Sequence, residues 1–252
     1  MQATVANHEF KSARQELARQ ELANHEFKST NRAFESARRI NRSLTAAQEK
    51  RALEWMAARV PRWVSSDQLT LLGLAAQIGA GACYALARYD RRALLLVIVC
   101  LALNWFGDSM DGTLARVRRQ QRPRYGFYVD HMVDCFGSIA LMCGLAWSGF
   151  VHWQTAMAML VAFLLLSSES YLATYTLTCF KMSQGMFGPT EIRLLLIVGN
   201  LALLRSPYAT WIGPRVLLFD VGGAIAAASM FAMAVAVAVR HTAELYHQEP
   251  LP

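Results

Sequence analysis

The chain has 252 residues, of which 54% are hydrophobic and 17% are charged, and its formal net charge is +7. A typical soluble domain is about one-quarter charged, and a disordered chain is poorer in apolar residues. The five cysteines include no C-x-x-C pair, so the sequence offers neither a zinc motif nor a dithiol motif. With no secretory signal before the first polar stretch, these features argue against a disulfide-stapled secreted domain, collagen, a coiled coil and a disordered chain.

The charged residues are concentrated in the N-terminal part. They make up 20 of the first 68 residues and 23 of the following 184. Residues 1–43 contain the heptapeptide ANHEFKS twice, at 6–12 and 23–29, and no proline, which predicts a charged helical arm with a short duplication. Residues 44–68 are amphipathic, which is typical of a helix lying in the membrane interface or packed on a membrane domain. Their apolar face consists of Leu53, Met56, Ala57, Val60, Trp63 and Val64.

The remaining chain predicts an all-α, polytopic membrane domain at 69–240, followed by a polar tail at 241–252. A helix needs roughly 20 mostly apolar residues to cross a bilayer, and these stretches lack the alternating polarity of membrane strands. Six transmembrane helices are expected, at 69–87, 93–112, 127–149, 154–177, 190–207 and 217–239. The fifth of these is the shortest.

The connection at 113–126 holds five arginines and no acid. Short loops rich in Lys and Arg stay in the cytoplasm, so we expect this end to face the cytoplasm and the protein to lie in the bacterial inner membrane. Arg88, Arg91 and Arg92 between the first two spans weaken that bias.

Four of the ten acids that follow residue 68 fall within a single window of 27 residues. Asp108 and Asp111 are three residues apart, and Asp130 and Asp134 are four apart, so each pair shares a helix face. A charge at mid-membrane costs roughly 2.5–3.5 kcal/mol even on a lenient scale, so four acids need partners or a watery cavity. Oxygen-only clusters favour Mg²⁺, Ca²⁺ or Mn²⁺, and two such ions suit a diphosphate because they neutralise charge on the leaving phosphate. The alternative is that the four acids pair with the loop arginines.

The same window has a regular pattern of acids, glycines and one arginine. It reads Asp108-x-x-Asp111-Gly112-x-x-Ala115-Arg116, nine residues, and Gly126-x-x-x-Asp130-x-x-x-Asp134. This pattern resembles the signature of the CDP-alcohol phosphotransferases, and the resemblance extends over about 44–240. It implies a membrane transferase of phospholipid biosynthesis that moves a substituted phosphate group from a CDP-activated alcohol to an acceptor alcohol and releases CMP.

The resemblance also implies a role for each matching residue. The ligands of two Mg²⁺ or Mn²⁺ ions would be Asp108, Asp111, Asp130 and Asp134, and Asp134 would also be the candidate base for the acceptor hydroxyl. The CDP part would be contacted by Gly112, Ala115 and Arg116, with Gly126 allowing close approach. The implied partners are the CDP-alcohol, the acceptor, membrane lipids and a second copy in a homodimer, with no nucleic acid.

Two later segments bear on the substrate. A Glu-x-Tyr motif begins at Glu169 in the fourth span, and a Gly-Pro-Thr-Glu motif ends at Glu191. Both motifs, together with the Asp-His pair that ends at His131, resemble the choline/ethanolamine phosphotransferase branch, in which CDP carries the head group, diacylglycerol is the acceptor and His131 becomes a second candidate base. Arg193 instead favours an acceptor phosphate with CDP-diacylglycerol as the donor. The plainer alternatives are a buried pair of Glu169 with Tyr or Ser and a helix-start carboxylate at Glu191.

Two other functions share some of these features. A membrane prenyltransferase also binds a diphosphate through aspartates, but its two motifs lie on widely separated helices. A divalent cation transporter would use the carboxylates as a transport site, but such sites lie near the midplane, and the neighbouring arginine-rich loop repels cations. An assay for CMP release distinguishes the transferase from the prenyltransferase and from the cation transporter.

Overall fold

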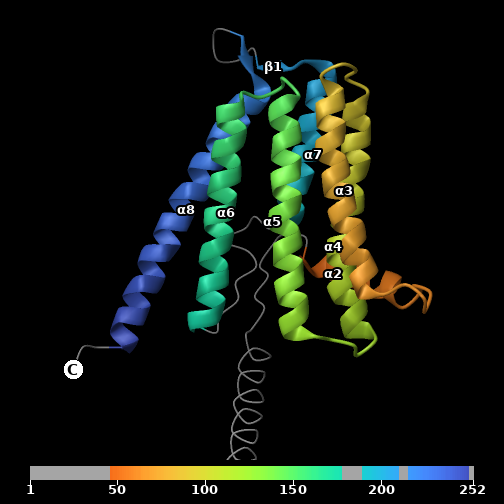
Figure 1. Cartoon of the computed structure of the whole chain (residues 1–252), viewed down its shortest axis with the longest axis vertical. Helices are drawn as coiled ribbons and strands as arrows, with labels where there is room; N and C mark the ends of the chain where they lie inside the picture. The colour runs from red at the N-terminus through yellow and green to blue at the C-terminus, as the bar shows by residue number, and fades with distance from the viewer. Residues whose placement is uncertain (1–45, 178–188, 210–214, 250–252) are drawn as a thin grey trace, which may run out of the picture.

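The computed structural model describes residues 46–177, 189–209 and 215–249, so the arm expected at 1–43 lies outside the described residues. The described part forms seven helices and two short strands, which stand together as an elongated bundle (Figure 1). The helices are α2 (Ala46–Ala57), α3 (Ser66–Ala87), α4 (Ala93–Val117), α5 (Pro123–Trp147), α6 (Trp153–Leu177), α7 (Pro189–Arg205) and α8 (Leu218–Gln248). Strands β1 (Tyr208–Ala209) and β2 (Val216–Leu217) pair antiparallel in the connection between α7 and α8.

Five of the described helices, α3, α4, α5, α6 and α8, are long and apolar enough to cross a membrane. Their outward side chains are large and apolar: Leu71, Leu96 and Val161 are more than half exposed, as expected for surfaces that face lipid rather than water. The expected fifth span at 190–207 corresponds to α7, whose 17 residues rise roughly 26 Å, less than the roughly 30 Å of a hydrocarbon core. The chain is therefore a helical polytopic membrane protein in which the helix at the expected fifth span is shorter than the helices at the other five.

Helix α3 packs against both α4 and α5, while α7 packs on α4, and α6 lies between α5 and α8. The α4–α5 connection lies at one end of the bundle, and the α3–α4 and α5–α6 connections lie at the other end with β1 and β2 (Figure 1). Helices α6 and α8 pack mainly on each other, and this pair meets the rest of the bundle through α6 against α5 and through Phe219 of α8 against Gly199 of α7.

Glycines allow α3 to approach its neighbours closely. A Cβ at Gly107 of α4 would lie 2.7 Å from both the Gly73 nitrogen and the Leu69 oxygen of α3. Two turns further along α3, Gly81 meets Gly144 and Ala140 of α5 backbone to backbone. Small residues at helix contacts are the usual means of tight packing in membranes, where burial of apolar surface provides no driving force.

The amphipathic segment forms a shorter helix than expected. Helix α2 ends at Ala57, because Pro61 lacks a backbone N–H and disfavours helical geometry in the residue before it. Helix α3 then begins at Ser66, capped by the Ser65 hydroxyl, which accepts from the Gln68 backbone N–H at 3.2 Å. The expected boundary at 68 therefore falls inside α3.

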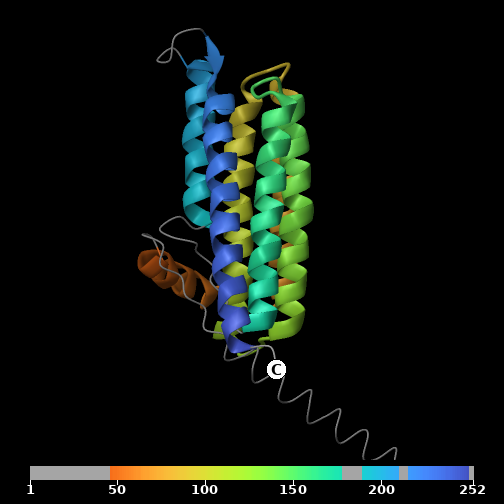
Figure 2. The same cartoon turned by 90° about the vertical axis from the view of Figure 1, so that its left-hand side faces the viewer.

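The apolar face of α2 is buried against the membrane domain. Leu53 and Ala57 pack with Leu69 of α3 and with Met110 and Leu114 of α4. Figure 2 shows α2 lying across the bundle, below the start of α7. The helix therefore packs on the membrane domain, and its crosswise direction also suits an interfacial position.

Helix α8 extends beyond the expected end of the membrane domain at residue 240. It continues as one helix to Gln248, so the expected polar tail begins as helix. Residue His241 consequently lies on the face of α8 that packs against α6, where it has a partner described below.

Candidate active site

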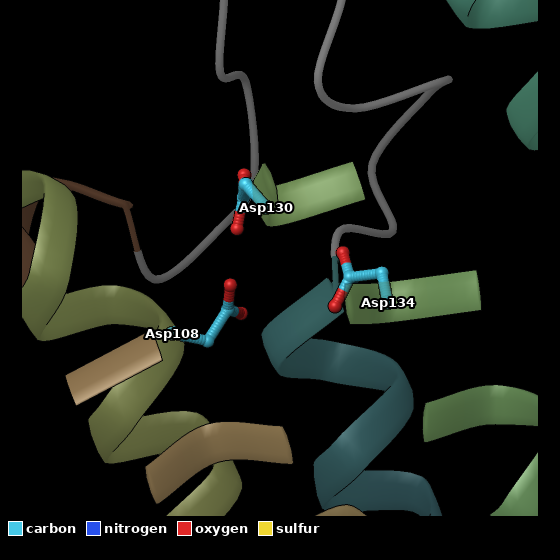
Figure 3. A group of neighbouring side chains, drawn as sticks. All are labelled: Asp108, Asp130 and Asp134. Carbon is cyan, nitrogen blue, oxygen red and sulfur yellow. The ribbon is translucent and has the colours of Figure 1, made fainter. Parts of the chain in front are cut away.

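Helices α4 and α5 bring three carboxylates together. One oxygen each of Asp108, Asp130 and Asp134 lies within 4.8 Å of the others, and Figure 3 shows the three side chains pointing toward one another. All three are partly buried. Like charges at this separation repel by roughly 3 kcal/mol per pair at an effective dielectric constant near 20, so the group favours a bound cation. An oxygen-only donor set fits a hard divalent ion.

The fourth expected ligand, Asp111, is not a member of this group. Its Oδ2 accepts from the Thr70 hydroxyl of α3 at 2.5 Å, its other oxygen accepts from the Gly112 N–H, and its backbone oxygen accepts from the Ser66 hydroxyl at 2.9 Å. A spacing of three residues turns a helix by about 300°, so Asp111 is offset from Asp108 toward α3. Its role as a metal ligand stays a prediction.

Arg193 of α7 joins the carboxylate group directly. Its guanidinium donates to Asp108 Oδ2 at 2.6 Å and, through Nε, to Asn104 Oδ1 at 2.8 Å. The Asn104 amide in turn donates to the Gly73 carbonyl oxygen at 3.0 Å and to Gln77 at 3.3 Å. A polar chain therefore runs from α3 through α4 to the first turns of α7, and it fixes an arginine beside the acids.

The imidazole of His131 faces α6. Its Nδ1 lies 2.7 Å from the Phe127 carbonyl oxygen, and its ring packs against Phe127 and edge-on against Tyr171, with centroids 4.1 Å and 4.5 Å away. The same Nδ1 is 3.7 Å from Asp130 Oδ2. His131 therefore sits beside the acid cluster, among aromatic side chains.

Glu169 pairs with a histidine of α8. Its Oε1 lies 2.5 Å from His241 Nδ1, and the two side chains are only 12% and 15% exposed. This contact joins α6 to α8. The side chain of Glu191, the other acid considered for substrate binding, lies outside the described part of the chain.

The residues expected to contact the CDP part lie at the α4–α5 end of the bundle. Gly112 and Ala115 are partly buried on α4. Arg116 is exposed and donates to the Thr113 hydroxyl at 2.8 Å. Gly126 is exposed on α5, where a Cβ would meet nothing within 4 Å, so the structure leaves open space at that position.

Two arginines hold the α4–α5 connection against the α2–α3 connection and the start of α3. Arg118 donates to the backbone oxygens of Val60 at 3.0 Å and Pro61 at 2.8 Å. Arg122 donates to both Asp67 oxygens at 2.5 and 2.6 Å, and this bonding raises the pKa of the exposed Arg122 guanidinium further above its usual value. Arg118 and Arg122 therefore bind the α2–α3 region, and the arginine that pairs with Asp108 is Arg193 of α7.

The sequence pattern did not point to several of these partners. Thr70 and Gln77 lie in an apolar stretch of α3. Glu49 of α2, which accepts from the Trp105 indole N–H of α4 at 2.8 Å, lies four residues before Leu53 on the apolar face of its own helix. Each acts through a neighbour that is distant in the chain. The signal that the sequence does contain is a polar side chain among apolar ones, as at Gln77 in an apolar helix and at Glu49 on an apolar helix face.

Comparison with known proteins agrees with this geometry. The family model of the CDP-alcohol phosphatidyltransferases matches residues 63–240, which include all three clustered carboxylates and Arg193. Among solved structures, the chain resembles Mycobacterium tuberculosis phosphatidylinositol phosphate synthase with CDP-DAG bound, at 19% identity and a TM-score of 0.51, covering 78% of this chain and 92% of that one. No curated protein matches the chain.

The matched region and the carboxylate group favour a transferase over the membrane prenyltransferase and the cation transporter. The family signature lies in the C-terminal part of α4 and the N-terminal part of α5, whose carboxylates come together. The chain belongs to the CDP-alcohol phosphatidyltransferase family and is a CDP-alcohol phosphotransferase, a membrane transferase of phospholipid biosynthesis.

Proposed function

We propose that the protein transfers a phosphatidyl group from CDP-diacylglycerol to the hydroxyl of an acceptor that itself carries a phosphate, with release of CMP. The observation that supports this choice is Arg193, which is 13% exposed and bonded to Asp108. A guanidinium suits a phosphate because it can donate two parallel hydrogen bonds. The similar synthase from Mycobacterium tuberculosis has CDP-DAG bound, in keeping with a lipid donor.

The carboxylate group is the proposed metal site. Asp108, Asp130 and Asp134, with Asp111 by family resemblance, would hold two Mg²⁺ or Mn²⁺ ions. When bound, such ions neutralise charge that builds on the diphosphate as CMP leaves. The donor would lie toward the α4–α5 end, with its CDP part against Gly112, Ala115 and Arg116 and with Gly126 leaving room for it.

In the proposed reaction, the acceptor oxygen attacks the phosphorus that bears diacylglycerol. A new P–O bond forms to the acceptor, the bond between that phosphorus and the bridging oxygen breaks, and CMP departs with the bonding electrons. Asp134 takes the proton of the attacking hydroxyl, which needs a base within hydrogen-bond reach. Arg193 holds the acceptor's own phosphate and so orients the hydroxyl.

The choline/ethanolamine alternative offers His131 as a second candidate base. In this protein its Nδ1 is engaged by the Phe127 carbonyl oxygen, and its ring is packed against Phe127 and Tyr171. Asp134 points toward the other two carboxylates instead. These contacts favour Asp134 as the base and a positioning role for His131 beside Asp130.

The membrane topology completes the proposal. We propose six crossings, with α7 as the short fifth one, an active site facing the cytoplasm of a bacterial inner membrane, and a homodimer. The arginine-rich α4–α5 connection supports this orientation.

The test is an assay of purified protein with a matrix of donors and acceptors in Mg²⁺ or Mn²⁺, measuring CMP release and identifying lipids by mass spectrometry. We expect activity with CDP-diacylglycerol and a phosphate-bearing alcohol. The variant Arg193→Ala should raise the acceptor KM about 10- to 100-fold, since a hydrogen bond to a charged group contributes roughly 1.5–3 kcal/mol.

Arg205→Ala is the matched control for Arg193→Ala. Arg205 is an exposed arginine in the last turn of the same helix, and its removal should leave the acceptor KM unchanged. Activity confined to CDP-choline or CDP-ethanolamine with diacylglycerol, together with an unchanged KM in Arg193→Ala, would contradict the proposed substrates.

A further inference from the structure

One carboxylate of α2 receives hydrogen bonds from two other helices. Glu49 Oε1 accepts from the Trp105 indole N–H at 2.8 Å and from the Ser109 hydroxyl at 3.3 Å, both on α4. It also accepts from the Thr190 hydroxyl in the first turn of α7, at 3.1 Å, with the second oxygen 3.3 Å away. Glu49 is therefore the point at which α2, α4 and α7 are joined by side chains.

The two turns of α4 that contact Glu49 also bind Arg193. Asn104 and Asp108, each one residue before a donor to Glu49, accept from Arg193 at 2.8 and 2.6 Å. Thr190 and Arg193 are three residues apart and share a face of α7. The beginning of α7 is thus fastened to α4 twice, by Arg193 directly and by Thr190 through Glu49.

The position of α7 makes the second fastening important. Helix α7 begins partway along the bundle, above the crosswise α2 (Figures 1 and 2). The backbone N–H groups of its first turn have no partner within the helix, so side-chain contacts matter more for the stability of this turn than for the helix interior. An arginine side chain loses roughly 2 kcal/mol of rotamer entropy when it is fixed. If the backbone of α7 is already fixed, less conformational entropy is lost when the Arg193 side chain binds the phosphate, because only the side chain must still be ordered.

We propose that Glu49 is a positioning residue that fixes the first turn of α7 and thereby holds Arg193 in place for the acceptor phosphate. The inference rests on the proposed function of Arg193. Helix α2 would then have two roles: it covers Leu69, Met110 and Leu114, and it positions the arginine that α7 contributes to the substrate site. The hydrogen-bond donors to Glu49 are Trp105, Ser109 and Thr190, so its proposed effect on the site is through α4 and α7.

The first experiment measures amide hydrogen exchange by mass spectrometry on the intact protein in lipid nanodiscs, without substrate. Glu49→Ala should speed exchange in the first two turns of α7, and Thr190→Val, which removes only the hydroxyl, should do the same. Glu54→Ala is the matched control on α2, because Glu54 is exposed and pairs only loosely with Lys50 at 3.9 Å. Unchanged exchange in α7 for both Glu49→Ala and Thr190→Val would overturn the proposal.

The second experiment separates positioning from general stability by kinetics. Glu49→Ala and Thr190→Val should each raise the acceptor KM about two- to tenfold, in line with the loss of ordinary hydrogen bonds, while the donor KM and kcat stay near wild type. Glu49→Gln, which keeps an acceptor oxygen, should recover part of the loss. The double variant Glu49→Ala/Arg193→Ala should be no worse than Arg193→Ala, because both changes affect one contact.

The two experiments distinguish this proposal from the function it rests on. If the wild-type protein uses no phosphate-bearing acceptor, the proposed function fails, yet the exchange result still decides whether Glu49 fixes α7. If exchange rises in α7 and the acceptor KM does not change, Glu49 secures the helix without positioning Arg193, and the inference is wrong.

Discussion

Asp134 combines two proposed roles at one residue, metal ligand and base. We expect Asp134→Asn to lower turnover by at least about 10²- to 10⁴-fold, the usual contribution of a general base, while the protein folds normally. Its thermal unfolding temperature without added metal should equal or exceed that of wild type, because the substitution removes one of three mutually repelling charges.

The measurements for Asp134→Asn are CMP release and thermal unfolding in detergent. Met132→Leu serves as the control, since Met132 is 38% exposed on the same helix and should behave as wild type in both. Turnover within a fewfold of wild type in Asp134→Asn would exclude it as the base.

At the residue scale, the sequence predicted acids better than it predicted their partners. Helical spacing and the family signature pointed to Asp108, Asp130 and Asp134 because local geometry places them on helix faces. The pairing of Asp108 with Arg193 joins α4 to α7, and that of Asp111 with Thr70 joins α4 to α3. Such contacts depend on how helices pack, which the spacing along one helix does not contain.

The contact between α3 and α4 depends on the absence of one side chain. A methyl group at Gly107 would come within 2.7 Å of the α3 backbone at Gly73 and Leu69, and backbone cannot move aside cheaply. We expect Gly107→Ala to destabilise the protein by about 1–3 kcal/mol, the usual cost of overpacking, and to reduce activity because Asp108 follows directly.

Gly222→Ala is the matched control for Gly107→Ala. Gly222 lies in α8, is exposed, and has nothing within 4 Å of an added Cβ. Thermal or denaturant unfolding in detergent measures both variants. An unfolding midpoint for Gly107→Ala as high as that of Gly222→Ala would show that α3 and α4 separate without cost.

At the element scale, composition located the long helices well and the short ones less well. Apolar length alone finds α3, α4, α5, α6 and α8. The end of α2 at Ala57 follows from Pro61 downstream, and α7, with 17 residues, begins at Pro189 and ends two residues before Pro207. The small strands β1 and β2 arise from pairing of two dipeptides, too short for any periodic signal.

On the scale of the whole molecule, the carboxylates and the end of α8 share one end of the bundle. Figure 1 shows the α4–α5 connection and the C-terminal end of α8 at the same end. If the site faces the cytoplasm, a fluorescent protein fused after Pro252 should fluoresce, and alkaline phosphatase fused there should stay inactive. Both reporters fused instead in the β1–β2 connection should give the reverse pattern, and the same pattern at both positions would contradict the proposed orientation.

The carboxylates lie at an intermediate depth. Asp130 and Asp134 lie roughly 10 and 16 Å along α5 from its start, and Asp108 lies roughly 14 Å before the end of α4, at the helical rise of 1.5 Å per residue. This is the depth of the glycerol backbone and the first acyl carbons when the helix ends reach the lipid head groups. A lipid donor would thus present its diphosphate to the carboxylates while its chains stay in the leaflet, and the CMP released would have only this short depth to cross to reach water.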